Sequence, residues 1–197
     1  AVMGINPSRF IGPQKPVQNE SWREAILFCN RLSAWEGLEP CYDFLEDVGN
    51  DDEWLKTVKW KQSANGYRLP TEAEWEYCAR GGEEHRYAGD NHVLETAWYI
   101  ENSLRGPKNV GLKKTNGFGL CDMSGNVWEW CWDAWKSDAY SRENVVDPSV
   151  HTSNSNRVGR GGCWESNVRN VRVSNRNNSH ASTRSGNVGF RIFRTVS

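Results

Sequence analysis

The chain has 197 residues, a formal net charge of −1 and 37% hydrophobic residues, among them eleven tryptophans. The near-neutral charge argues against a nucleic-acid-binding surface, and no apolar run reaches the roughly 18 residues that a membrane-spanning helix needs. The six cysteines are scattered, without the spacing of a disulfide scaffold or of a zinc site. At this length one large domain is expected, with the tryptophans supplying much of its core.

Two helices are predicted from capping signals followed by helical periodicity. Ser21 and Glu24 form a capping box, and apolar residues recur every three or four positions behind it until Gly37. Thr71 and Glu74 form a second box, whose helix ends at the glycine pair 81–82. Within these helices we expect Cys29 and Cys78 to be buried as small hydrophobic residues.

Short alternating segments elsewhere are typical of strands. Residues 54–60 and 188–193 alternate apolar and polar side chains, and clusters of Gly, Asn and Ser separate such segments. Long loops join them, and long ordered loops are usually functional or held by their own packing. Two main helices, short strands and much irregular loop together predict an α+β domain.

Four long motifs follow one another along the chain in the order of a known family. They are residues 2–8 with 16–22, RLPTEAEWEY at 68–77, FGLCDMSGNVWEW at 118–130, and a tail that opens RGGCW at 160 and closes NVGFR at 191. This pattern resembles formylglycine-generating-enzyme-like domains of the sulfatase-modifying factor family, which have a C-type-lectin-like fold. The resemblance implies one such domain over 1–197. The family's first strand normally precedes residues 2–8, so a fragment is expected, with any signal or anchor in the missing part.

Most residues of these motifs have a plain structural interpretation. We expect Arg68 and Glu74 to form a buried ion pair. Tryptophans expected in the core are Trp75, Trp128 and Trp130, and glycines expected at positive φ are Gly117, Gly119 and Gly125. No cofactor is predicted to be required.

Calcium is the one metal that the resemblance raises. Asp122 and Glu129, with Gly125 and Val127, match positions that bind structural calcium in some relatives, and two carboxylates with backbone carbonyls suit a hard cation. The alternative is that Asp122 caps its own turn.

The family's oxidase chemistry depends on two cysteines that hold copper and engage a substrate thiol. The resemblance places them at Ser166 and Val171, whose side chains cannot ligate Cu(I), while Cys163 stands alone where serine is usual. An iron-dependent branch needs histidines from a further domain. We therefore expect a protein that is not an enzyme. An inactive relative with a structural or accessory role, and an active copper oxidase, remain as alternatives.

The tail also resembles the variable region of proteins diversified by a retroelement, of the treponemal type. There, template adenines are randomised, so that an AAY codon becomes NNY, which encodes Ser, Thr, His and Asn but never Trp or Glu. The segment of about 160–194 is rich in permitted residues. Those predicted to form a variable ligand-binding surface are Ser166, Asn167, Asn177, Asn178, Ser179, His180, Ser182, Thr183 and Ser185.

This resemblance implies a receptor-like or adhesin-like protein at the cell surface. Its partner would be a protein or another cell-surface ligand, with no nucleic acid and no membrane insertion, and the chain would be a monomer. The nine permitted residues should be exposed and lie on one surface, since close-packed positions do not tolerate varied side chains. The fixed residues Arg172, Arg176, Arg184, Phe190 and Ile192 should be more buried and contact the rest of the domain.

Overall fold

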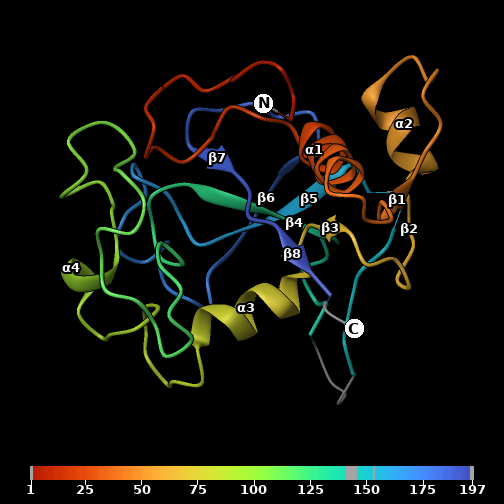
Figure 1. Ribbon diagram of the computed structural model, residues 1–197. Helices are drawn as coiled ribbons and strands as arrows, with labels where there is room; N and C mark the ends of the chain where they lie inside the picture. The colour runs from red at the N-terminus through yellow and green to blue at the C-terminus, as the bar shows by residue number, and fades with distance from the viewer. Residues whose placement is uncertain (1, 141–145, 153, 196–197) are drawn as a thin grey trace.

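The computed structural model describes residues 2–140, 146–152 and 154–195. Within these ranges the helices are α1 (Trp22–Trp35), α2 (Asp51–Thr57), α3 (Glu72–Arg80) and α4 (Val93–Thr96). The strands are β1 (Tyr42–Asp43), β2 (Lys59–Trp60), β3 (Tyr67–Arg68), β4 (Trp128–Ala134), β5 (Asn156–Arg160), β6 (Arg176–His180), β7 (Val188–Gly189) and β8 (Phe193–Arg194). Long irregular loops connect them (Figure 1), so the α+β C-type-lectin-like fold is confirmed.

A four-stranded sheet in the order β6-β5-β4-β7 forms the centre. β4, β5 and β6 are antiparallel neighbours, and β7 joins β4 in parallel, with Trp128 opposite Val188. Two small antiparallel sheets, β1-β2 and β3-β8, complete the described strands. Figure 1 shows α1 on one side of the central sheet and α3 on the other.

Both predicted capping boxes are present. The Ser21 hydroxyl accepts from the Glu24 amide while the Glu24 carboxylate accepts from the Ser21 amide, and Thr71 and Glu74 exchange the same two bonds. α3 ends at Gly81, whose φ of 60° is the left-handed conformation of a glycine C-cap. Sequence thus sets the starts of both main helices.

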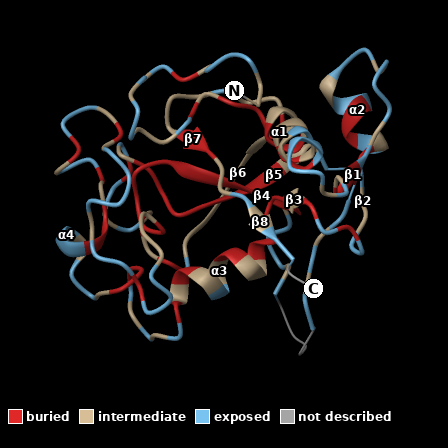
Figure 2. Ribbon diagram, in the orientation of Figure 1, coloured by how far each residue is buried: buried red, intermediate tan, exposed pale blue. Residues whose placement is uncertain are grey.

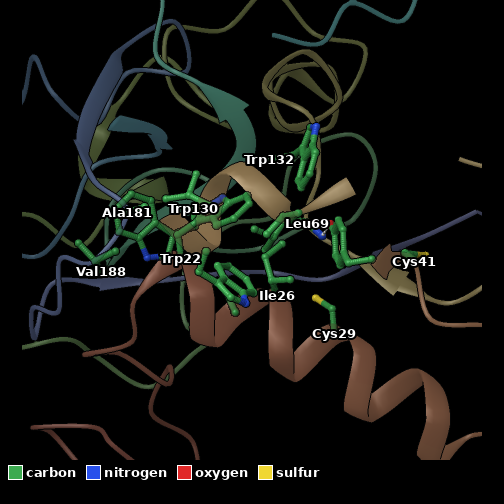
Figure 3. Packing of buried hydrophobic residues seen from close by; sticks show 14 of the residues in the cluster. Trp22, Ile26, Cys29, Cys41, Leu69, Trp130, Trp132, Ala181 and Val188 are labelled. Atoms are coloured by element: carbon green, nitrogen blue, oxygen red, sulfur yellow. Dashed lines mark hydrogen bonds between the residues drawn. The ribbon is translucent and has the colours of Figure 1, made fainter. Parts of the chain in front are cut away.

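The core lies on both faces of β4, whose residues are all buried (Figure 2). Alternate side chains of β4 point to opposite faces. Trp130 and Trp132 pack against Trp22 and Ile26 of α1 (Figure 3), and Cys131 packs with Trp75 of α3. The predicted core positions Trp75, Trp128 and Trp130 are therefore confirmed.

Residues 54–60 were expected to be a strand, and that prediction is wrong. Residues 51–57 form α2, and only Lys59–Trp60 is a strand. The Asn50 side chain accepts from the Glu53 amide, and three acidic residues lie in the first turn, where the helix dipole favours them. The Asn50 cap and the acidic first turn therefore stabilise a helix here, although apolar and polar residues alternate as in a strand.

The second strand prediction is half right, because residues 188–193 divide into β7 and β8 with an unpaired stretch between them. Among the glycines, Gly119 and Gly125 have positive φ as expected. Gly117 does not: it is required instead because a Cβ there would lie 2.4 Å from the carbonyl oxygen of Gly81. Cys29 is buried, but Cys78 is only half-buried.

Candidate functional site

The C-terminal segment, residues 160–194, runs from the end of β5 to β8, and between these strands it crosses the start of α1 and the loop at Asn19. Beyond β6 it passes the start of α1, where the Trp22 amide donates to the Ala181 carbonyl over 2.9 Å. The Asn19 amide then donates to the carbonyls of Ser185 and Val188. The segment is held at both ends and in the middle by backbone hydrogen bonds.

Two arginines fasten β5 and β6 to α3. Arg176 places its guanidinium on both oxygens of Glu72, at 2.6 and 2.7 Å. Arg160 is fully buried, pairs with Glu76, and lies 3.4 Å from the same Glu72 carboxylate. Since Glu72 is itself 1% exposed, these charges stabilise one another away from water. The prediction that Arg176 contacts the fixed domain is confirmed.

An ion pair between an arginine and a glutamate also fixes the far end of the segment. Arg191 makes two 2.7 Å bonds to the Glu129 carboxylate, which also accepts from the Trp75 indole. Asp122 adopts φ 57° and accepts from the amide of Gly111, eleven residues away, rather than from its own turn. Both Glu129 oxygens thus already serve protein donors. The calcium site stays a prediction.

The positions matched to the family's two cysteines are packed in the interior. The Ser166 hydroxyl accepts from the Cys163 amide at 3.0 Å and lies 3.3 Å from the Cys163 sulfur. Burial raises the pKa of the Cys163 thiol, so it remains protonated at neutral pH. Val171 is fully buried beside Tyr87 and Tyr99. A protonated thiol, a hydroxyl and an isopropyl group offer no pair of thiolates for copper.

Four of the nine permitted residues form most of β6. Asn177, Asn178, Ser179 and His180 pair with β5 through their backbones and are all half-buried at the edge of the central sheet. The Asn178 amide oxygen accepts from Asn156, and His180 Nε2 lies 3.1 Å from an Asp52 oxygen of α2. Their backbones are fixed while part of each side chain reaches solvent.

Most of the other permitted residues also reach solvent. Ser182, Thr183 and Ser185 are half-buried where the segment crosses the start of α1, and Asn167 is exposed. Asn167 lies on a separate loop, whose neighbour Ser166 accepts from the Ile100 amide. The two stretches approach each other where the Trp164 indole donates to the Gly186 carbonyl, at 3.1 Å.

Three burial predictions for this segment are wrong. Ser166 is 7% exposed, because its hydroxyl supports the Cys163 turn. Arg184 is exposed, because its carboxylate partner, Glu24, lies in the first turn of α1 at the surface. Ile192 is 37% exposed, because it falls in the unpaired stretch between β7 and β8. Arg172 and Phe190 are half-buried, and Phe190 packs edge-to-face on Phe28.

Acidic residues of α2 lie next to the permitted residues, a placement that the sequence analysis missed. Asp51, Asp52 and Glu53 line a hollow with His180 and Ser182. The acidic first turn behind Asn50 is a signal of this helix, but the strand predicted over 54–60 left the helix unassigned. The surface of the segment therefore includes a fixed acidic border.

Comparison with known proteins agrees with this geometry. The model of the sulfatase-modifying factor enzyme 1-like domain matches residues 2–196. The chain belongs to this family. It is 36% identical to chaperone protein LppX of Paenibacillus barcinonensis, over 98% of the chain and 75% of that protein. It is 38% identical to the formylglycine-generating enzyme of Streptomyces coelicolor, over 64% of the chain but only 46% of that enzyme.

Among solved structures, the fold is similar to Treponema denticola variable protein 1. The two superpose with a TM-score of 0.89 at 37% identity, over 97% of this chain and 78% of that one. The predicted likeness to a variable protein on a formylglycine-generating-enzyme-like fold is thereby confirmed. In the described residues, no helix is long and apolar enough to cross a membrane.

Proposed function

We propose that this protein is a non-enzymatic binder whose C-terminal segment is a diversified ligand-binding surface. One observation carries the proposal. The polar positions from Asn177 to Ser185 keep part of their side chains in solvent, while Arg160, Arg176 and Arg191, which flank them in the chain, bind carboxylates of the fixed domain. Such a surface tolerates change, because substitutions away from packed features usually alter stability by less than about 0.5 kcal/mol.

The ligand is a protein or another molecule of a cell surface, bound by a monomer displayed outside the cell. The residues proposed to contact it are Asn167, Asn177, Asn178, Ser179, His180, Ser182, Thr183 and Ser185. Ser166 belongs instead to the fixed, buried part of the segment. The similarity to the treponemal variable protein supports this function.

The absence of catalysis is part of the proposal and rests on chemistry. Copper oxidation of a thiol needs two thiolates, and the matching positions hold Ser166 and Val171. We expect no conversion of a sulfatase-type cysteine peptide to formylglycine, with or without copper. Copper-stimulated turnover that disappears in Cys163→Ser would establish the oxidase alternative.

An accessory role is the second candidate. The specific observation in its favour is the similarity to LppX, a protein named as a chaperone, along nearly the whole chain. In that case the C-terminal segment would keep one sequence for one client protein rather than vary.

A pair of displayed libraries tests the binding surface without knowing the natural ligand. In the first library, six positions are randomised together: Asn167, Asn178, Ser179, Ser182, Thr183 and Ser185. In the control library, six exposed positions on other loops are randomised: Glu39, Glu46, Gln62, Ser63, Glu84 and Thr115. Both are selected against the same folded target protein.

The proposal predicts that most clones of the first library fold and that binders arise from it far more often than from the control library. Loss of folding in most clones of the first library would refute the proposal, since its positions would then be structural. Equal yields of binders from the two libraries would also count against a specialised surface.

A further inference from the structure

Arg157, in β5, is a buried cation without a counter-charge. It is 2% exposed, and its guanidinium carbon lies 4.6 Å from the centre of the Trp22 ring. The other buried arginines, Arg68 and Arg160, each pair with a glutamate. Within the residues that the structure describes, Arg157 forms no ion pair, and its Nε atom has no hydrogen-bond partner. Burying an unpaired charge costs free energy, so this guanidinium favours an anion beside it.

The carboxylate that comes nearest to neutralising Arg157 is committed elsewhere. Burial lowers the pKa of Arg157 to about 10, and Asp133 opposes this shift only in part. Asp133 accepts from the amides of Glu72 and Val150, at 2.7 and 2.6 Å. It also precedes Ala134, the residue opposite Arg157 on β4, so it points to the other face of the sheet. On the face towards α1 the described domain therefore leaves Arg157 uncompensated.

One of the permitted positions lies directly opposite this arginine. β5 runs between β4 and β6 (Figure 1), and the register pairs Arg157 with Ser179. Residues opposite one another in an antiparallel pair share a face of the sheet, with Cβ atoms about 4.5–5.5 Å apart. Ser179 is half-buried and among the smallest side chains that could stand there. This neighbourhood is set by strand pairing within residues 128–180.

A hollow of about 260 Å³ lies close to the same arginine. Its described lining residues are Leu55, Lys56, His151 and Thr152. Burial, and then the Arg157 charge, lower the pKa of His151, so the guanidinium lies near this wall of the hollow. The described lining has a lysine and no carboxylate, so the hollow favours an anion over a cation.

We propose that Arg157 is a carboxylate-binding residue beneath the variable surface, and that the small Ser179 leaves it to an Asp or Glu side chain of a protein ligand. The guanidinium can offer such a group two parallel hydrogen bonds. This inference rests on the proposed function and deepens it, because it names the chemistry of the ligand. Residue 179 sets whether the ligand reaches the arginine, while Arg157 itself belongs to the fixed domain.

Ser179→Asp tests whether a carboxylate on this side of β6 pairs with Arg157. The variants are made in the natural-length gene product, and Ser179→Asn is the neutral counterpart of the same shape. The melting temperature of Ser179→Asp should exceed that of Ser179→Asn by about 2 °C or more, because the new pair is partly shielded from water. In Arg157→Met this advantage should vanish or reverse, since the carboxylate then has no partner.

Asn178→Asp is the matched control, because Asn178 stands opposite Val158 and points to the other face of the sheet. Its effect on the melting temperature should be the same in the wild-type chain and in Arg157→Met. Arg157→Met alone should leave the melting temperature unchanged or raise it, since an apolar side chain of similar length replaces an unpaired buried charge. If Arg157→Met does not fold, the comparison of Ser179→Asp with Asn178→Asp in the wild-type chain decides.

A second experiment tests the ligand's part. The first library described above is selected against one folded target of net negative charge and one of net positive charge. Arg157→Met is then introduced into binders that carry Gly, Ala or Ser at position 179. Affinity for the negative target should fall about tenfold or more, because a buried charge pair is lost. Binders of the positive target should keep their affinity.

Two results would overturn the proposal. One is an equal melting temperature for Ser179→Asp and Ser179→Asn, or a difference that persists in Arg157→Met. The other is an unchanged affinity of Arg157→Met binders for the negative target. A library without any binders would refute the proposed function, and with it the ligand's part here, whereas the melting temperatures would still show whether Arg157 binds a carboxylate.

Discussion

Ser166 is a permitted residue that the structure nevertheless places in the fixed, buried part of the segment. It follows the RGGCW motif and is an allowed product of a randomised codon, yet it is buried and accepts from the Cys163 amide. Its neighbour Asn167 has the same codon freedom and is exposed. Codon rules can say which residue types are permitted, whereas only packing decides which positions are free.

Paired alanine substitutions test this distinction. Ser166→Ala should lower the free energy of unfolding by about 1 kcal/mol, the usual worth of a buried hydrogen bond. Asn167→Ala should change it by less than about 0.5 kcal/mol. Denaturant unfolding of both variants measures the difference. Equal effects would mean that Ser166 is as free to vary as its neighbour.

Glu20 gives a pH-dependent prediction. Its pKa rises from an ordinary value of 4.5 to about 7 in the folded protein. Between these values the folded state keeps a proton that the unfolded state has released, so stability falls as pH rises from about 4.5 to 7 and then levels off. Glu20→Gln should abolish this fall. The free energy of unfolding of the variant, relative to that of the wild type, should therefore increase by about 2 kcal/mol across this range, allowing for solvent screening.

Urea unfolding at pH 4.5 and pH 8 measures this change. Glu46→Gln, at an exposed carboxyl, is the control and should retain the wild-type pH dependence. If the free energy of unfolding changes by the same amount between pH 4.5 and pH 8 in the wild type and in Glu20→Gln, then Glu20 is not held in an apolar site.

At the scale of elements, capping signals predicted more than alternation did. Both capping boxes identified real helices, because their hydrogen bonds lie within four residues and need no partner elsewhere. Residues 54–60 failed because alternation was read without the Asn50 cap upstream. The pairing of the strands could not be predicted from the sequence, since β4 pairs with β7 some 60 residues further along the chain.

Arg176 tests the attachment of β6 to α3. Arg176→Met removes both bonds to the buried Glu72 and leaves that carboxylate only Arg160, so it should cost about 2 kcal/mol or more. Arg184→Met breaks an exposed pair with Glu24 in the same segment and should cost less than about 1 kcal/mol. Thermal unfolding compares the two, and the reverse order would mean that β6 is not fixed through Glu72.

For the molecule as a whole, the motifs identified the fold because most of their residues build the core. Trp75 is fully buried between α3 and the central sheet, and its indole donates to Glu129. The candidate surface was less predictable: its positions came from codon types, and the neighbouring acidic turn of α2 follows only from the folded chain.

Trp75→Ala should destabilise the domain by about 3–5 kcal/mol, the range for emptying a large aromatic site in a core. Phe118→Ala, at a half-exposed aromatic residue, is the control and should cost far less. Circular dichroism in denaturant measures both. An unchanged midpoint for Trp75→Ala would contradict the assignment of the core.

Sequencing the gene and its surroundings in many clones tests the central claim, that residues 160–194 form a diversified surface, most directly. The account predicts a nearby copy of the DNA encoding this segment, with differences confined to adenines of that copy. The differences should fall in codons for solvent-reaching residues such as Asn167, Asn178 and Thr183, and should spare Arg160, Trp164 and Arg176. Absence of such a copy would contradict the account. So would differences spread evenly over codons for buried residues and codons for solvent-reaching residues.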